Sequence, residues 1–338
     1  MIYNAPVFFE KNRAYRVYLG GKMFDYLMGD GSVDSNLPEE WIASAVEALN
    51  EGRDVYKEGV SKIAGTDLYF DKALEMYKEE MLGEKDNIGI LTKYLDSAIR
   101  LPAQCHPDKP FSREYFNSQY GKEECWLVLA TRPGGCVYFG FEDGVTREDL
   151  EAVVDESETN KDAFVKILKR HDVVPGDVIF IPAKVPHAIG AGCLILEVQE
   201  PTDFTIQPEH YCGDIKLSEH EMYLGLGRKT ALDCFSFEPV KQTKVPPVLV
   251  SDKDGVKFER LITEAQTNCF SMNRITLSGG EFKLAQSAGV YCVVEGNGKI
   301  TGPDYEREIK QGEYFFLPAA ATDKYTICGN LTLVESYS

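Results

Sequence analysis

The sequence lacks long hydrophobic runs and has no excess of positive charge. Its longest apolar stretches, such as the one around Ile179, have strand length, whereas a membrane-spanning helix needs about 20 apolar residues. Acidic residues number 54 and basic residues 36, so the formal net charge is −18. Nucleic-acid phosphates and anionic membrane surfaces would repel such a chain. We therefore expect a small-molecule partner and neither nucleic-acid nor membrane partners.

A disulfide framework and a cysteine-based zinc site are also missing. The nine cysteines are odd in number, widely spaced and never arranged as CxxC. The first 16 residues show no charged segment followed by an apolar one, the pattern of a secretory signal. Most of these cysteines are therefore expected to be small buried residues in a reducing compartment, which predicts a cytoplasmic protein. The oligomeric state is left open.

The remaining pattern favours a mainly β protein with two domains. A chain of 338 residues suits about two domains of roughly 150 residues each. Short apolar runs bounded by Gly, Pro and Asp predict antiparallel strands. They form two sets: 125–130, 135–141, 176–183 and 193–199, then 270–277, 289–296, 312–319 and 325–336. The polar segment 241–255 between the sets predicts a linker, so we expect domains at 1–245 and 250–338.

The two sets share a spacing that indicates a duplicated β-barrel. Gly176, Pro182 and His187 in the first set match the positions of a Gly, a Pro and Asp323 in the second. The second copy therefore lacks the histidine. Helical spacing of apolar residues predicts helical insertions in or around the first domain, at about 67–85, 146–170 (with Thr146 as N-cap) and 218–232.

Imidazole chemistry is confined to the first domain, because all five histidines precede residue 221. Gln104 and His106 share one face of an extended segment, since side chains alternate along a strand. Glu124 stands at the entry to a strong strand, and His187 follows the turn after another. Two imidazoles and two oxygen ligands suit zinc or a harder divalent ion, with positions open for substrate. The alternative is that these histidines are isolated structural residues.

Two further side chains are candidates for the same pocket. Lys122 shares the strand parity of Glu124, so it could hold an anion or steer a proton; the alternative is a solvated surface lysine. Glu197 lies in the apolar run 193–199, where a carboxylate is costly to bury unless it is paired or functional. It is a candidate general base. The alternative is a barrel-mouth residue bonded to backbone or to a lysine.

Several blocks resemble class I (type I) mannose-6-phosphate isomerases of the cupin superfamily. The resemblance covers most of residues 1–240 and continues weakly beyond; its blocks are 18–24, 39–44, 91–110, 121–126 and 175–205. It implies two cupin domains, each a jelly-roll β-barrel, and one Zn²⁺ per chain or another divalent metal. It also implies Gln104, His106, Glu124 and His187 as metal ligands, with Lys122 and Glu197 in the active site.

Two positions depart from the family pattern. Gln207 stands where the pattern has an arginine near the reacting sugar, and Pro102 replaces a serine that helps to hold phosphate. These departures put efficient catalysis or the phosphorylated substrate in question. Lys93 or Arg100 are further candidates for the pocket mouth.

The predicted activity is a metal-dependent aldose–ketose isomerase that interconverts mannose 6-phosphate and fructose 6-phosphate through a cis-enediol. Lys122, Glu197 and Gln207 are the catalytic candidates. The alternatives are a sugar-binding or regulatory cupin with little turnover, an isomerase of a related unphosphorylated sugar, and an iron-dependent cupin oxygenase. The residues identify no role for the second cupin.

Overall fold

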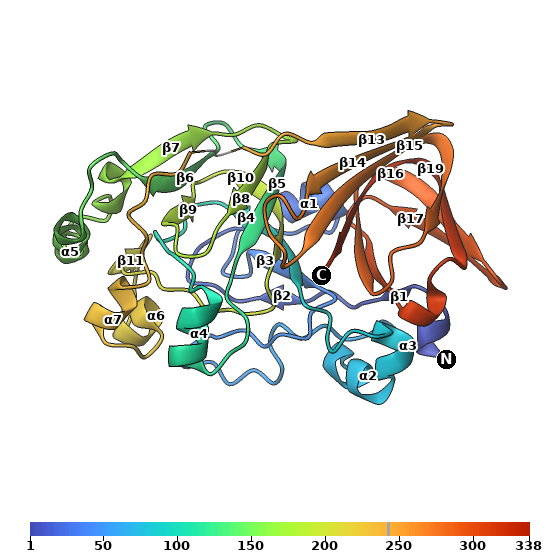
Figure 1. The fold of residues 1–338 in the computed structure, drawn as a ribbon, viewed down its shortest axis with the longest axis horizontal. Coiled ribbons are helices and arrows are strands. Elements are labelled where there is room, and N and C mark those ends of the chain that lie inside the picture. The colour runs from blue at the N-terminus through green and yellow to red at the C-terminus, as the bar shows by residue number, and fades with distance from the viewer. Residues whose placement is uncertain (242–243) are drawn as a thin grey trace.

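The fold is mainly β, and its strands gather in two groups (Figure 1). The computed structural model describes residues 1–241 and 244–338. All strand ladders within these ranges are antiparallel, as the sequence predicts. Both predicted sets of strands are present, the first in the green and yellow half of the ribbon and the second in the orange and red half.

The first group contains a six-stranded and a three-stranded sheet. The larger sheet has the order β2 (Arg13–Ala14), β3 (Glu39–Ile42), β4 (Leu91–Ser97), β10 (Cys193–Gln199), β5 (Glu124–Thr131) and β8 (Val178–Ile181). The smaller sheet has the order β7 (Leu168–Asp172), β6 (Cys136–Phe141) and β9 (His187–Ile189). A separate hairpin pairs β11 (Tyr211–Cys212) with β12 (Ile215–Lys216). Strand β10 is buried along its whole length, which explains its continuous apolar run.

The second group is one eight-stranded sheet. Its order is β1 (Val7–Phe8), β18 (Tyr314–Leu317), β16 (Gly289–Gly302), β19 (Tyr325–Tyr337), β15 (Ser271–Leu284), β14 (Val256–Ile262) and β13 (Val248–Lys253), with β17 (Tyr305–Lys310) also pairing with β16. The first strand of the chain therefore belongs to the sheet of the last: Val7 is opposite Phe316.

Each of the three predicted segments contains helix, with differences in extent. Residues 67–85 contain α2 (Phe70–Met76) and α3 (Lys78–Leu82), and α3 lies against the short turn η3 (Ala319–Ala321) of the second group. Residues 218–232 contain α6 (Glu219–Tyr223) and α7 (Arg228–Leu232). Two helices were not predicted, α1 (Met23–Met28) and α4 (Lys109–Phe116), nor was the turn η1 (Ile2–Asn4).

The helix expected over 146–170 ends early. Helix α5 (Arg147–Glu156) begins with the predicted cap, because the Thr146 side chain accepts from the Asp149 N–H in a capping box. The chain then turns through residues that disfavour a helix interior, Thr159 and Asn160 among them. A short turn, η2 (Phe164–Lys166), and strand β7 follow.

The segment expected as a linker is also partly regular. Gln242 and Thr243 lie outside the described residues, whereas 248–253 form strand β13, which pairs with β14. This strand was not predicted, because it does not alternate between buried apolar and exposed polar residues. Its apolar residues Val248, Leu249 and Val250 are consecutive and remain more than half exposed at the sheet edge. No helix of the described residues is long and apolar enough to cross a membrane.

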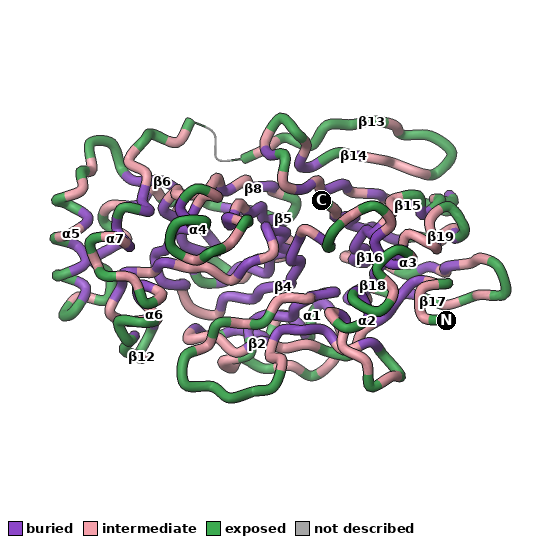
Figure 2. Tube along the Cα trace, turned by 60° about the horizontal axis from the view of Figure 1, so that its bottom comes forward, coloured by how far each residue is buried: buried purple, intermediate pink, exposed green. Residues whose placement is uncertain are grey.

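The core is continuous between the two groups of strands (Figure 2). One apolar cluster includes Leu127 and Leu196 of the first group, Met272 and Phe316 of the second, and Phe70 of α2. A polar contact crosses the same boundary, since the Tyr314 hydroxyl on β18 donates to Oε1 of the fully buried Glu40 on β3.

Tyr314→Phe should lower the free energy of unfolding by about 1–3 kcal/mol, because a buried carboxylate loses a hydrogen bond. Urea denaturation measures the change. The control is Tyr26→Phe, since Tyr26 is 66% exposed. Equal effects of the two variants would contradict a stabilising role for the contact.

Candidate metal centre and its pocket

Three segments bring two histidines and a glutamate together. Glu124 begins β5 and His187 begins β9. His106 follows two isolated bridges: Gln104 exchanges two backbone hydrogen bonds of 2.9 Å with His187, and Cys105 pairs with Ile206. These bridges, rather than the regular strand expected from the sequence, place Gln104 and His106 beside β9.

The cluster is compact and buried. One ligand atom from each of His106, Glu124 and His187 lies within 4.8 Å of the others, and no other group of this kind occurs among the described residues. The Nε2 atoms of His106 and His187 are 3.1 Å apart. Glu124 Oε2 is 3.2 Å from His106 Nε2, and Glu124 Oε1 is 3.4 Å from His187 Nε2.

The hydrogen bonds of the two imidazoles fit a cation at the centre of this cluster. Each Nδ1 lies 2.9 Å from a backbone carbonyl oxygen, that of Phe204 for His106 and that of Val185 for His187. A neutral imidazole that donates from Nδ1 presents a lone pair at Nε2. Two lone pairs thus face each other beside a carboxylate, and the buried Glu124 Oε2 accepts no hydrogen bond. This donor set fits a divalent metal ion.

The pKa values of the three groups favour the metal-binding protonation states. Burial, followed by the charge of Lys122, lowers the pKa of His106 to about 3. Burial also lowers the pKa of His187. Burial opposes the charge of Glu124, but Lys122 and the imidazoles hold its pKa well below the ordinary value. Both imidazoles are therefore neutral and the carboxylate is ionised at neutral pH.

Lys122 lies next to the cluster, and Glu197 lines the same cavity as Lys122 and Glu124. Lys122 Nζ is 3.1 Å from Glu124 Oε2 and 2.9 Å from His106 Nε2. Glu197 on β10 faces Lys93 on β4, with 3.1 Å between Oε1 and Nζ. Burial and then the charge of Glu124 raise the pKa of Glu197 to about 7. A carboxyl group with that pKa can both accept and release a proton at neutral pH.

One cavity lies beside the cluster and is lined by Glu124, but not by His106 or His187. Its lining includes Gln104, Lys122, Glu124, Glu197 and Gln207, and also Pro102, where the sequence lacks the family serine. Lys93 lines the cavity, whereas Arg100 is not part of the lining and pairs with Glu209 at 2.8 Å.

Gln207 contacts helix α6, whose residue Glu221 also lines the cavity. Its Nε2 donates to the Glu221 carbonyl oxygen of α6 at 3.2 Å. The amide therefore helps to attach helix α6 to the body of the protein, and it brings no charge into the cavity.

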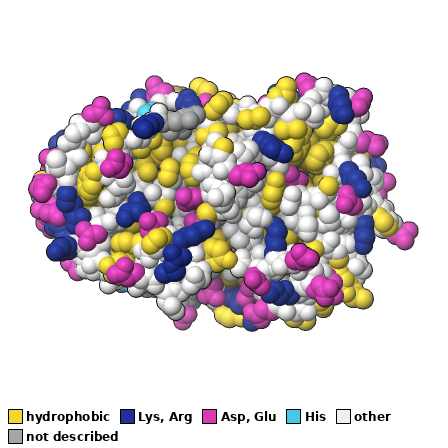
Figure 3. Space-filling model, viewed as in Figure 1, with side chains coloured by type: hydrophobic (Ala, Val, Ile, Leu, Met, Phe, Trp, Pro, Cys, Tyr) yellow, Lys and Arg dark blue, Asp and Glu magenta, His cyan; other side chains and the backbone are white. Residues whose placement is uncertain are grey.

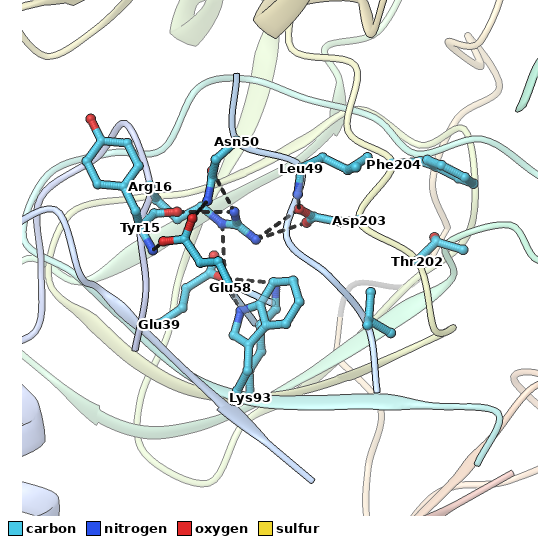
Figure 4. Close-up of polar contacts among 12 residues, drawn as sticks. Tyr15, Arg16, Glu39, Leu49, Asn50, Glu58, Lys93, Thr202, Asp203 and Phe204 are labelled. Atoms are coloured by element: carbon cyan, nitrogen blue, oxygen red, sulfur yellow. Dashed lines mark hydrogen bonds and ion pairs between the residues drawn. The ribbon is translucent and has the colours of Figure 1, made fainter. Parts of the chain in front are cut away.

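Several charged lining residues were not predicted, among them Arg16, Glu39 and Asp203 (Figure 4). Arg16 pairs with Glu39 at 3.1 Å and with Asp203 at 3.0 Å. Glu39 lies on a strand that is buried throughout, but the sequence of that strand, EEWI, is only half apolar and gives a weaker signal than the apolar run around Glu197. Arg16 lies next to strand β2, in a stretch without periodicity, and gives no such signal.

The equivalent position in the second group is different. Asp323, which matches His187 in spacing, is exposed and pairs with Lys283 at 2.9 Å. No ligand cluster accompanies it among the residues of known placement.

Comparisons with known proteins agree with the fold. A family model described as "Mannose-6-phosphate isomerase, cupin domain" matches residues 262–338. The mannose-6-phosphate isomerase ManA of Bacillus subtilis is 27% identical over 318 residues, covering 93% of each chain. The mannose-6-phosphate isomerase of Streptococcus mutans is 26% identical and covers 98% of each chain.

A solved structure confirms the architecture. The crystal structure of the mannose 6-phosphate isomerase from Bacillus subtilis superposes with a TM-score of 0.80 at 23% identity, covering 99% of this chain and 100% of that one. Another similar structure, with a TM-score of 0.72 at 15% identity over 98% of this chain and 99% of that one, is a mannose 6-phosphate isomerase bound with zinc and yttrium. Residues 262–338 thus match the mannose-6-phosphate isomerase cupin family model, and the chain as a whole is similar in sequence and in fold to mannose-6-phosphate isomerases.

Proposed function

We propose that this protein is a metal-dependent aldose–ketose isomerase that interconverts mannose 6-phosphate and fructose 6-phosphate through a cis-enediol. The observation that carries the proposal is the pair of facing imidazole Nε2 atoms beside Glu124, which lines a cavity together with Lys122 and Glu197. The names of the similar proteins support the same activity.

The proposed metal is one Zn²⁺ per chain, with another divalent ion as the alternative. Gln104, His106, Glu124 and His187 would hold it. Gln104 is included because it lines the cavity and pairs through its backbone with the ligand His187. When bound, the ion supplies Lewis-acid stabilisation of the negative charge that develops on the two sugar oxygens.

The chain itself supplies the proton transfers. Glu197 is the proposed base, since its carboxylate lines the cavity and its pKa of about 7 suits reversible proton transfer. Burial opposes the charge of Lys93, but Glu197 and Glu39 hold its pKa above the ordinary value, so it stays a cation beside the base. Lys122 is the proposed donor to an oxygen of the sugar.

The second candidate is a sugar-binding cupin with little turnover. The specific observation in its favour is Gln207, whose amide donates to the Glu221 carbonyl oxygen of α6 and gives the reacting sugar no positive charge. A coupled assay for fructose 6-phosphate, together with elemental analysis, tests the choice. Turnover that depends on zinc supports the isomerase, sugar binding without turnover supports the binding protein, and bound iron favours the oxygenase.

Gln207→Arg should raise kcat/KM for mannose 6-phosphate by about tenfold to a hundredfold. The change replaces a neutral donor by a charged one in a partly dry pocket, which is worth roughly 1–3 kcal/mol. Parent and variant are compared on mannose 6-phosphate, with free mannose as the control substrate. A slower variant, or a parent that prefers the neutral sugar, would contradict this account of the pocket.

The proposal assigns catalysis to residues 1–245 and leaves 250–338 as a second cupin without metal ligands. The proposed substrate is a small sugar phosphate. Nucleic acid is not a proposed partner, because basic and acidic side chains are intermixed over the face drawn in Figure 3 and form no continuous basic patch there. We place the enzyme in the cytoplasm, because all nine cysteines are free, as a reducing compartment requires.

A further inference from the structure

The side chain of Arg16, at the cavity wall, makes polar contacts with four different residues (Figure 4). Its Nη2 lies 3.0 and 3.1 Å from the two carboxylate oxygens of Asp203. Its Nη1 donates to the Tyr15 carbonyl at 3.2 Å and to Asn50 Oδ1 at 3.1 Å, and its Nε lies 3.1 Å from Glu39 Oε2. These contacts engage all three nitrogen atoms of the guanidinium. The surrounding carboxylates and carbonyls therefore compete with a substrate anion for Arg16.

The carboxylate that Arg16 holds joins two functional segments. Asp203 Oδ2 also accepts the Leu49 N–H at 2.8 Å, which fixes residues 49–50 at the cavity wall. The next residue, Phe204, offers its carbonyl oxygen to His106 Nδ1 at 2.9 Å. The Phe204 ring is stacked on Phe116 with 4.6 Å between centroids. The orientation of the His106 imidazole thus depends on a peptide group whose neighbouring side chain is bound by Arg16.

We propose that Arg16 is a positioning residue: through Asp203 it holds the carbonyl group that orients His106 toward the metal, and it anchors residues 49–50 over the cavity. The proposal rests on the metal site of the proposed function. Groups that orient a metal-binding histidine typically change metal affinity by 10–100-fold when removed. Arg16 acts through one further residue, so we expect an effect at the lower end, about tenfold.

The charge of Arg16 suits this role better than substrate binding. Its guanidinium lies between Glu39 and Asp203 and its side chain is 11% exposed. Burial opposes its charge, but Asp203 and Glu39 hold its pKa above the ordinary value. Lysine at this position would keep the charge but could not supply five donors in a planar fork.

The test is the affinity for Zn²⁺, measured by competition with a chromophoric chelator. Arg16→Met should weaken Zn²⁺ binding about tenfold, and Arg16→Lys should weaken it less. Trypsin gives a second readout without turnover, because Arg53 and Lys57 lie in the segment that follows residues 49–50. Cleavage at these sites, identified by mass spectrometry, should be faster in Arg16→Met than in the parent.

Arg147→Met is the matched control, because Arg147 also bridges two carboxylates, those of Glu151 and Asp233, but lies at the start of α5 outside the cavity. It should bind Zn²⁺ as the parent does. A double-mutant cycle with Asp203→Asn tests the route. If Arg16 acts through Asp203, the double variant binds Zn²⁺ no more weakly than the weaker single variant.

Unchanged Zn²⁺ affinity in Arg16→Met, or additive losses in the cycle, would overturn the proposal. If Arg16→Met does not fold by circular dichroism, Arg16→Lys decides on the same criteria. The outcome is separable from that of the proposed function. If the parent binds Zn²⁺ but has no isomerase turnover, the proposed function is wrong and the positioning role still stands. If the parent is an active isomerase but its Zn²⁺ affinity does not change when Arg16 is replaced, the positioning role is wrong and the proposed function stands.

Discussion

His106→Ala and His187→Ala should each lower Zn²⁺ affinity by more than about a hundredfold and abolish isomerase turnover. Each change removes one of four proposed ligands, and the loss should exceed the 10–100-fold typical of groups that merely orient a ligand. Both side chains are essentially inaccessible, at 1% and 0% exposure, so no other histidine can substitute from the surface. Elemental analysis of the purified variants gives the metal content, and the coupled assay gives turnover.

His171→Ala is the control for this experiment, because His171 lies on β7 and its Nε2 is 3.3 Å from the Phe139 carbonyl oxygen, away from the cluster. His210 and His220 should likewise be dispensable for metal. Full metal occupancy in both His106→Ala and His187→Ala would refute the assignment of the centre.

Glu197→Gln should reduce kcat by about a hundredfold to ten-thousandfold while leaving metal content unchanged. The substitution keeps the shape of the side chain but removes the proton acceptor, and general-base catalysis contributes about that much to a rate. The matched control is Glu335→Gln. Glu335 is also a buried glutamate with a pKa raised by burial, but it lies on β19 and bonds to Asn273 and Tyr291. Loss of metal in Glu197→Gln, or similar losses of kcat in both variants, would argue against a base at this position.

The pH dependence of the parent follows from the same carboxyl group. A base acts in its ionised form, and the pKa of Glu197 is about 7. The rate should therefore fall as the pH drops through about 7, and the residual rate of Glu197→Gln should show no such limb. A kcat profile of both proteins between pH 5 and pH 9 checks this expectation.

Much of this architecture could be predicted from the sequence because apolar runs and turn residues record local burial. Strands β6, β8 and β10 lie within predicted segments, and β5 extends one residue beyond its segment at each end. Glu124 was identified from its place at the entry to a strand, and His187 from its place after the turn that follows a strand. The spacing of Gln104 and His106 also predicted their proximity. These features depend on neighbours that are close in the sequence or share one strand face.

The parts that escaped prediction depend on partners far apart in the chain. Strand β13 keeps its apolar side chains exposed and is recognised only by its pairing with β14. Arg16 meets Asn50 and Asp203, and nothing in the residues around any of the three indicates the other two. An arginine whose three guanidinium nitrogens all contact protein acceptors differs from a solvated one only in its tertiary contacts, which a single sequence does not contain.

The pairing of β1 with β18 constrains the order in which the chain can fold during synthesis. Val7 and Phe8 are synthesised long before their partners Phe316 and Phe315. Strand β1 must therefore stay unpaired until β18 has been made, and β18 lacks this neighbour until the two meet. Variants that lack β1 should thus aggregate more readily than the chain that has both strands, even when every residue of the metal centre is present.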